Sequence, residues 1–133
     1  MIQGREFTVG VFRTKGRIIV LPITEVRANA DKAFFDYEAK YQGKSTETTP
    51  AEIDATKADK INRAAEKIYA LFNCRGVVRI DFIYNEEMDE PFMLEINSIP
   101  GQSEASIVPQ QVLAMGWSLK EFYTKLVEEA LIS

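Results

Sequence analysis

Val77-Val-Arg-Ile-Asp-Phe-Ile-Tyr84 and Phe92-Met-Leu-Glu-Ile-Asn97 are the two runs around which this chain is built. Alternation of polar and apolar residues is typical of half-buried strands, so the pair is predicted to form a hairpin. The turn between them, 85–91, is centred near Met88. A symmetric antiparallel register then sets Asp81 opposite Glu95 and Arg79 opposite Asn97.

Directly opposed residues point to the same side of a sheet. The hairpin therefore carries four polar residues on one face, Arg79, Asp81, Glu95 and Asn97, which we call the polar square. The other face carries an apolar set (Val78, Ile80, Phe82, Leu94 and Ile96). Two opposed carboxylates repel unless a cation or a proton lies between them. Oxygen ligands beside an arginine suit Mg²⁺ bound to a phosphate-bearing substrate. The plainer alternative, a solvated face of an amphipathic hairpin, does not explain the tight polar loop that follows, Ser98–Ser103.

Length and composition exclude several classes of protein. The 133 residues suit one domain or part of one, and 46% hydrophobic residues are enough for a packed core. With a net charge of −4 and scattered basic residues, nucleic acid is not an expected partner. No run of membrane-spanning length and no signal peptide is present, so no membrane partner is expected. Cys74, the single cysteine, is expected to be buried and reduced, which favours a cytoplasmic location.

The remaining segments predict an α+β fold, an antiparallel sheet with helices packed on one side. Strands are expected at Glu6–Phe12, with Phe7, Val9 and Val11 inward, and at Arg17–Arg27, where both faces are apolar and either set can point inward. Helices are expected from Thr49, with a Thr49–Glu52 capping box, to Asn73; from Ser106 to Met115; and from a second capping box, Ser118–Glu121, onward. The expected buried stripes are Ile61, Ala64, Ala65, Ile68, Leu71 and Phe72, and then Leu119, Phe122, Leu126, Val127 and Leu131.

One long connection, Phe34–Pro50, has no clean period. Loops of this length in compact domains are usually functional or disordered. We expect Phe35–Tyr41 to be functional and Gln42–Thr49 to be mobile.

Arg79-Ile-Asp-Phe82 and Leu94-Glu-Ile-Asn-Ser-Ile-Pro-Gly-Gln-Ser103 resemble the C-terminal part of an ATP-grasp ligase. Phe35-Asp-Tyr-Glu-Ala-Lys-Tyr41 narrows the resemblance to the D-alanine–D-alanine ligases. It extends from Gly4 to the last helix. It implies that residues 1–133 are the C-terminal portion of an ATP-grasp domain, a fragment without the N-terminal domain and the first half of the ATP-grasp domain.

By this resemblance the parent enzyme joins two D-alanines with ATP through an acyl phosphate, for peptidoglycan synthesis. Asp81, Glu95 and Asn97 would hold two Mg²⁺ or Mn²⁺ ions. Arg79 and the backbone of Gly101 would stabilise the oxyanion. Residues implied to bind substrate are Ser106, Ile107 and Tyr41, and those implied to bind ATP are Glu6, Lys40, Phe34, Phe35 and Leu94, with Ile83 beside them. Ala105 departs from the family, in which many members carry His.

Two alternatives stay open. One is another ATP-grasp ligase, for example one that uses D-lactate, although Tyr41 in the Lys-Tyr pair favours D-alanine. The other is a metal- or nucleotide-binding module without catalysis. The resemblance also implies that the fragment alone is inactive without its N-terminal part, and a homodimer is considered for the parent enzyme.

Overall fold

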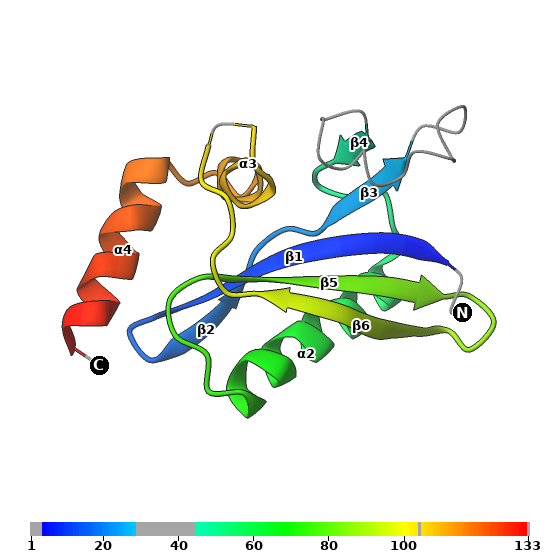
Figure 1. Ribbon diagram of the computed structural model, residues 1–133, viewed down its shortest axis with the longest axis horizontal. Coiled ribbons are helices and arrows are strands. Elements are labelled where there is room, and N and C mark those ends of the chain that lie inside the picture. Colours follow the sequence, from blue (N-terminus) through cyan, green and yellow to red (C-terminus); the bar gives the residue numbers. More distant parts are fainter. Residues whose placement is uncertain (1–3, 29–44, 104, 133) are drawn as a thin grey trace.

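The computed structural model describes residues 4–28, 45–103 and 105–132. Within these ranges a six-stranded antiparallel sheet is accompanied by three helices (Figure 1). The strands are β1 (Arg5–Thr14), β2 (Arg17–Val20), β3 (Thr24–Ala28), β4 (Ser45–Thr48), β5 (Val78–Asn85) and β6 (Glu90–Asn97); the helices are α2 (Ala55–Leu71), α3 (Ile107–Ala114) and α4 (Leu119–Ile132). The predicted α+β class, with an antiparallel sheet, is confirmed.

β1 is the centre of the sheet. The strands run in the order β4-β3-β1-β5-β6, and β2 also pairs with β1. The single strand predicted for Arg17–Arg27 is wrong, because the chain leaves β2 at Val20 and rejoins the sheet as β3 at Thr24. Pro22 lies in this break, and proline has no backbone N–H for a sheet ladder. The break lets two short strands pair with successive halves of β1.

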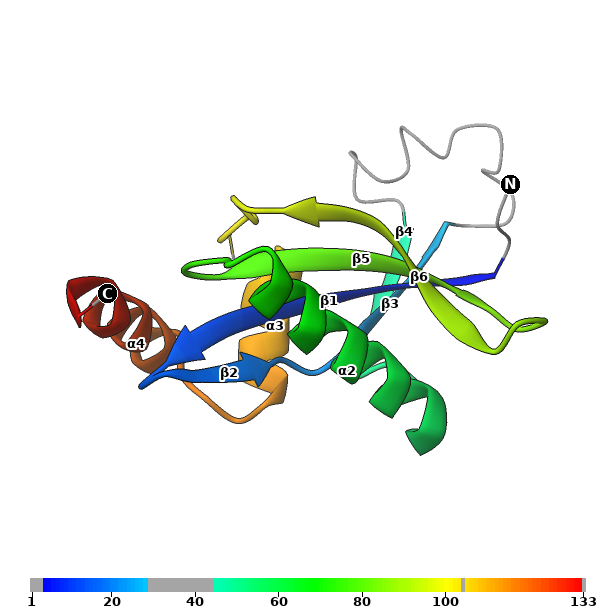
Figure 2. The ribbon, with the colours of Figure 1, turned by 90° about the horizontal axis from the view of Figure 1, so that it is seen from below.

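Helices cover both faces of the sheet, so the prediction that they lie on one side is wrong. α2 packs on the face that carries Phe7, Val9 and Val11. α3 and α4 pack on Phe12 and Leu21, which belong to the opposite face. In Figure 1, α2 lies below the strands and α3 above them, and Figure 2 shows α2 in front of the sheet with α3 behind it. The two apolar faces of β2 are explained in this way: Ile18 and Val20 join one core, and Ile19 joins the other.

The start of α2 differs from its prediction. Asp54 is the N-cap, and its carboxylate accepts the backbone N–H of Lys57 at 2.9 Å. The preceding segment is held by the sheet instead, since the N–H of Ala51 donates to the carbonyl of Ile23 at 2.8 Å. The capping box at Thr49 is therefore wrong. So is the mobility expected for the end of the long connection, because residues 45–48 form β4 and pair with β3; residues 29–44 lie outside the described part of the chain.

Both long helices bury less than their patterns predict. In α2, Ile61, Ala65 and Tyr69 are buried, whereas Leu71 and Phe72 are 74% and 58% exposed. In α4, Phe122 is buried, whereas Val127 and Leu131 are 58% and 81% exposed. These exposed residues lie outside the two buried clusters of the described chain. No helix in the described ranges is both long and apolar enough to span a membrane.

The capping box predicted before α4 is confirmed. The N–H of Glu121 donates to the hydroxyl of Ser118 at 3.1 Å, and the N–H of Ser118 donates to the carboxylate of Glu121 at 3.2 Å. These reciprocal bonds satisfy backbone donors that the first helical turn leaves without intrahelical partners. The start of α4 is thus encoded locally.

Candidate active site

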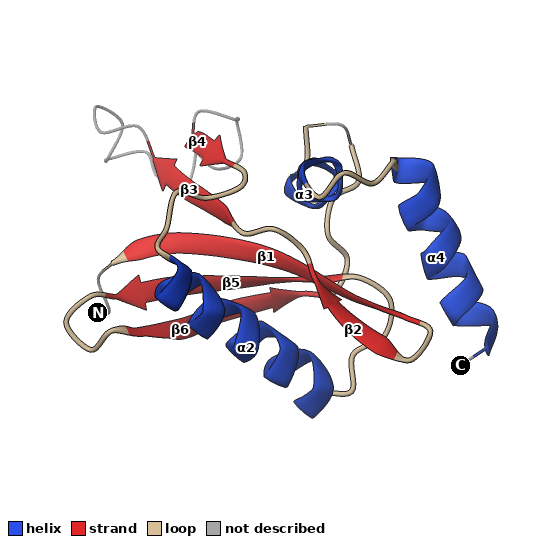
Figure 3. Cartoon of the chain, turned by 180° about the vertical axis from the view of Figure 1, so that it is seen from behind, coloured by secondary structure: helices blue, strands red, loops and turns tan. Residues whose placement is uncertain are grey.

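The polar square predicted on the hairpin forms in the structure. β5 and β6 pair with Arg79 opposite Asn97 and with Asp81 opposite Glu95. Figure 3 shows the two strands side by side. Directly opposed residues share a face, so the four side chains project from the same side of the sheet.

A β-bulge follows the square. The register shifts between Asp81 and Phe82, where Phe82 pairs with Met93 and leaves Leu94 as the extra residue of β6. A bulge breaks the alternation of side chains along the strand. Leu94 is consequently 50% exposed, so its predicted place in the apolar backing of the hairpin is wrong. Val78, Ile80 and Phe82 are buried as expected.

β1 extends the polar face beyond the hairpin. Thr8 pairs with Asp81 on one side and with Thr24 of β3 on the other. Thr24, Thr8, Asp81 and Glu95 therefore form a row across four strands. Glu6 lies two residues from Thr8 on the same strand and so on the same face. The register thus places Glu6 on the face that carries the square.

Asp81 is the most enclosed member of the square, with 7% of its surface exposed. Its Oδ1 accepts a short hydrogen bond from the hydroxyl of Thr8 and a second from Arg79 Nε at 3.1 Å. Its Oδ2 accepts from Arg79 Nη2 at 3.2 Å. A buried carboxylate needs such partners because water is not available to solvate it. Thr8 and Arg79 together hold this carboxylate in one orientation.

Arg79 is paired within the strand. Its guanidinium forms a two-pronged ion pair with Asp81, two residues away on the same face, and 23% of its side chain is exposed. It also acts on β4: burial raises the pKa of Glu47, and the positive charge of Arg79 opposes that rise. Arg79 therefore lies among carboxylates, and it supplies positive charge to the centre of the polar face.

The donor set fits a hard divalent cation that also binds phosphate. Asp81 and Glu95 offer carboxylates and Asn97 offers an amide oxygen, which are ligands that Mg²⁺ and Mn²⁺ accept. Among the described residues no group of three or more His, Cys, Asp or Glu side chains is arranged to hold a metal. The square is thus too small for an all-protein cage. It suits an ion whose remaining ligands are water and phosphate oxygens, the usual arrangement for Mg²⁺.

The loop after the square runs to the start of α3. The side chain of Asn97 accepts the N–H of Ile99 at 2.9 Å, which sets the direction of the loop. A Cβ at Gly101 would lie 2.7 Å from Ser106 Oγ, so any side chain there requires Ser106 to move. Gly101 is therefore packed closely against the residue that begins α3.

Ser106 is the N-cap of α3, as predicted, and Ile107 is the first helical residue. The hydroxyl of Ser106 makes no capping bond to the helix; it lies 2.8 Å from the hydroxyl of Ser103. A helix N-terminus presents backbone N–H groups and positive partial charge, which favour an anion. The start of α3 thus combines a hydroxyl pair with a helix N-terminus.

Gln111 connects α3 to β1 and was not predicted from the sequence. It is fully buried, and its Oε1 accepts the N–H of Gly10 at 2.8 Å. Its Nε2 donates to the carbonyl of Thr8 at 2.9 Å and to the hydroxyl of Thr24 at 3.0 Å. Gln111 therefore attaches α3 to the strand that supports Asp81. Nothing in the local pattern of the helix marks this glutamine, but the polar position of Thr8 in an alternating strand was a signal that could have been used.

The structure places Arg79, Asp81, Glu95 and Asn97 on one face of the hairpin, and it describes nine of the thirteen residues predicted for the site. Its described part holds Arg79, Asp81, Glu95, Asn97, Gly101, Ser106, Ile107, Glu6 and Leu94. The other four, Phe34, Phe35, Lys40 and Tyr41, lie outside the described residues. The roles assigned to all thirteen remain predictions.

Known proteins resemble this chain in both sequence and fold. The family described as "D-ala D-ala ligase C-terminus" matches residues 1–128. A D-alanine–D-alanine ligase of Flavobacterium johnsoniae is 45% identical over 130 residues, which cover 98% of this chain and 39% of the relative. One of Christiangramia forsetii is 43% identical, with the same coverage. The chain thus spans about two fifths of the length of the relatives it matches.

Several solved structures of ligases have a fold similar to that of this chain. A D-alanine–D-alanine ligase from Bacillus anthracis has a TM-score of 0.79 at 29% identity, covering 98% of this chain and 41% of the other. A structure of the ligase from the same species complexed with ATP has a TM-score of 0.78 at 26% identity, covering 98% and 39%. The VanG D-Ala:D-Ser ligase from Enterococcus faecalis has a TM-score of 0.78 at 31% identity, covering 96% and 36%.

Proposed function

Since the chain belongs to the D-Ala–D-Ala ligase C-terminal family, we propose that it is the C-terminal portion of the ATP-grasp domain of an ATP-dependent D-alanine–D-alanine ligase. The whole enzyme would join two D-alanines through an acyl phosphate and supply peptidoglycan synthesis in the cytoplasm. The observation that carries the proposal is the square of Arg79, Asp81, Glu95 and Asn97, which lies on one face of the hairpin. This chain would form one wall of the cleft.

In this proposal the polar square holds the ions that neutralise the negative charge of ATP. Asp81, Glu95 and Asn97 would hold two Mg²⁺ or Mn²⁺ ions, which supply charge neutralisation at the phosphates of ATP. Thr8 keeps the Asp81 carboxylate oriented by its hydrogen bond. Arg79 donates to both oxygens of Asp81, but Oδ2 accepts no other hydrogen bond within the described part of the chain and so keeps a lone pair that can bind a cation.

Arg79 and Gly101 would then act on the reacting groups. The Arg79 guanidinium lies on the same face and would donate to the oxyanion formed when the second amine attacks the acyl phosphate. The N–H of Gly101 would make a second donation there. Ser106 and Ile107, at the start of α3, would hold the carboxylate of the second D-alanine, since a helix N-terminus favours an anion.

The nucleotide would lie along the same face. Glu6 would bond the ribose, and Leu94, half exposed at the bulge, would contact the adenine together with Phe34 and Phe35. Lys40 would reach the γ-phosphate and Tyr41 would close over the second substrate. The first D-alanine and the remaining phosphate contacts would come from the N-terminal part that the longer relatives possess.

The second substrate is the least determined part of the proposal. A D-Ala:D-Ser ligase is among the similar structures, so this fold also occurs in a ligase named for a different second substrate. The D-lactate alternative belongs to the same question. Comparing D-alanine, D-serine and D-lactate in one assay would decide it.

The test is phosphate release from ATP by the full-length protein with Mg²⁺ and D-alanine. Arg79→Ala is expected to lower kcat by roughly 10²–10³-fold with a smaller change in KM, because its target charge exists only in the transition state. Arg63→Ala is the matched control, since Arg63 is an exposed residue of α2 paired with Asp59. The isolated chain is expected to release no phosphate. Absence of D-alanine-dependent turnover by the full-length protein would refute the ligase assignment, and a pure KM effect of Arg79→Ala would refute the oxyanion role.

A further inference from the structure

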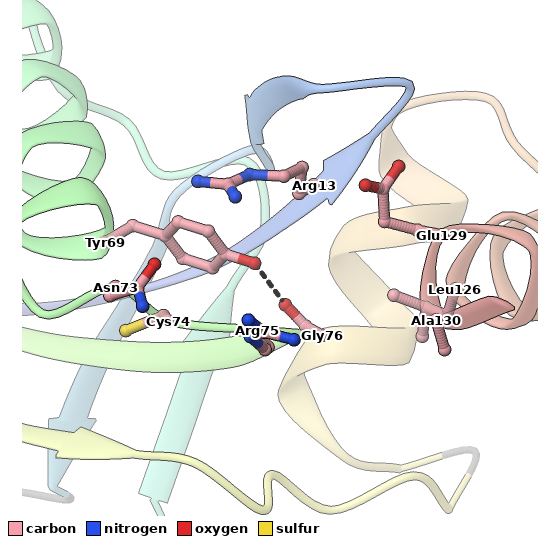
Figure 4. A pocket seen from close by; sticks show the side chains of 9 residues that line it. All are labelled: Arg13, Tyr69, Asn73, Cys74, Arg75, Gly76, Leu126, Glu129 and Ala130. Carbon is pink, nitrogen blue, oxygen red and sulfur yellow. Dashed lines mark hydrogen bonds between the residues drawn. The ribbon is translucent and has the colours of Figure 1, made fainter. Parts of the chain in front are cut away.

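A cavity lies away from the polar face. It has a volume of about 350 Å³ and lies among the end of β1, the loop after α2, and α4 (Figure 4). Known ligand pockets begin at about this size. Among the described residues that line it, none belongs to the candidate active site. The cavity therefore has no role in the proposed ligase chemistry.

Two charged side chains reach this cavity with atoms that lack partners. Arg13 Nε and Glu129 Oε1 are buried, and neither has a hydrogen-bond partner within the described chain. Arg13 comes from β1 and Glu129 from α4, and both line the cavity. Buried donors and acceptors are almost always satisfied in folded proteins. One donor and one acceptor in the same cavity therefore call for a molecule that offers the complementary pair.

Tyr69 forms part of the wall of the cavity. Tyr69 is fully buried, and its hydroxyl donates to the carbonyl of Gly76 at 2.7 Å (Figure 4). The guanidinium of Arg13 lies 5.6 Å from the centre of the Tyr69 ring, within range of a cation–π interaction. Asn73 and Gly76 both have positive φ, at 50° and 65°, and they bend the loop that forms this wall. The cavity is thus preformed.

Its charge is divided between two sides. Arg13 and Arg75 line it with positive charge, and Glu129 with negative charge. Both signs act on Tyr69: burial raises the pKa of its hydroxyl, the positive charge of Arg13 opposes the rise, and the negative charge of Glu129 adds to it. Leu126 and Ala130 supply an apolar part. A lone anion would satisfy Arg13 but not Glu129, and a lone cation would do the reverse.

We propose that this cavity binds a small zwitterion, a free amino acid or a dipeptide, whose carboxylate accepts from Arg13 and whose ammonium donates to Glu129. The apolar part of the cavity would take a small side chain. Such a site is separate from the amino acid sites of the proposed reaction.

The test is an amide NMR titration of the 133-residue chain with D-alanine, L-alanine, propionate and ethylammonium. At least one of the two alanines is expected to shift the amide signals of residues 73–76 and 126–130. Propionate and ethylammonium each lose one charged contact, so each is expected to bind roughly tenfold more weakly than the better alanine. Glu129→Gln should weaken the binding of that alanine by a similar factor. Glu128→Gln is the matched control, because Glu128 is an exposed neighbour on the same helix, and it should leave the affinity within about twofold.

Each outcome of the titration either supports the proposal or overturns it. Equal binding of propionate or ethylammonium would overturn the zwitterion assignment. Shifts confined to residues 101–107, or no shift up to the solubility limit, would show that the cavity holds water alone. If Glu129→Gln failed to fold, the comparison of the four ligands on the unaltered chain would still decide. Shifts at the cavity that Glu128→Gln preserves and Glu129→Gln loses would support the proposal.

Discussion

Both faces of β1 are buried against apolar clusters, but only one of them also holds buried polar groups of β1. On one face Phe7, Val9 and Val11 are fully buried in the core beneath α2. On the other, Thr8 is 2% exposed and meets Asp81 and Gln111. Burial alone therefore does not make a face apolar. The polar face is tolerated because its buried groups have hydrogen-bond partners, and that same requirement fixes their orientation.

The difference separates stability from function. The face beneath α2 gains its stability from apolar area removed from water. The face beneath α3 holds a hydrogen-bonded network whose members sit next to the polar square. We expect substitutions on the first face to unfold the chain, and substitutions on the second to change the geometry of Asp81 as well. Four experiments test this contrast, from the largest expected effect to the smallest.

Truncation of the apolar face should have the largest effect. Phe82→Ala removes a fully buried ring from the core beneath α2. The free energy of unfolding is expected to fall by about 3–5 kcal/mol. Urea unfolding followed by circular dichroism measures it. Phe72→Ala is the matched control, because Phe72 is 58% exposed and should cost much less. Equal losses in the two variants would contradict the assignment of the core.

Removal of the polar link should come next. Gln111→Leu preserves bulk but leaves the N–H of Gly10 and the carbonyl of Thr8 without their buried partner. Unpaired buried groups cost roughly 1–3 kcal/mol each, so a loss of about 2–3 kcal/mol is expected. Gln110→Leu, at an exposed position one residue earlier, is the control. Amide shifts at Thr8 and Asp81 should change only in Gln111→Leu. A neutral Gln111→Leu would show that the link does not stabilise this face.

Glu25 is the charged exception on the face beneath α2. It pairs across the sheet with Phe7, is 5% exposed, and forms ion pairs with Arg5 and Arg27, each at 3.0 Å. The hydrogen bond from Arg5 is the main cause that lowers the pKa of Glu25. Because the folded-state pKa is lowered, the stabilisation is complete above the ordinary value of 4.5 and is lost as the pH falls through the folded value.

Glu25→Gln should therefore destabilise the chain near neutral pH and have little effect in acid. A loss of about 1–2 kcal/mol is expected near pH 7, since Arg5 is partly solvated. Unfolding measured from about pH 3 to pH 7 would show the difference from the unaltered chain shrinking below the ordinary pKa. A difference that does not depend on pH would mean that packing, and not charge, is responsible. Glu128→Gln, on the exposed side of α4, serves as the control.

The smallest effect on stability is expected at Arg79. The glutamine introduced by Arg79→Gln keeps an amide donor beside Asp81, and Asp81 retains its hydrogen bond from Thr8, so the variant should cost about 1 kcal/mol. In the absence of nucleotide the same variant should tighten Mn²⁺ binding severalfold, because the guanidinium no longer competes for Asp81. Paramagnetic broadening of the amides of Asp81, Glu95 and Asn97 measures it, with Arg63→Gln as the control. Weaker Mn²⁺ binding in Arg79→Gln would contradict the competition.

Several features of the chain follow from short-range sequence alone. The alternation in the two runs and the position of the turn between them predict the register that sets Asp81 opposite Glu95. The box of Ser118 and Glu121 predicts the start of α4. These predictions succeed because each depends on residues close in sequence, whose geometry the backbone alone constrains.

Other features depend on contacts between distant residues. The break at Pro22, the start of α2 at Asp54 and the pairing of β4 all depend on the sheet, which satisfies backbone groups that local patterns assign elsewhere. The placement of helices on both faces depends in part on Gln111, about one hundred residues away in sequence from the strand it contacts. The cavity of Arg13 and Glu129 likewise joins β1 to the last helix. Periodicity shows which side chains share a face. Which element covers that face is decided only when the backbone donors and acceptors of the whole sheet find partners.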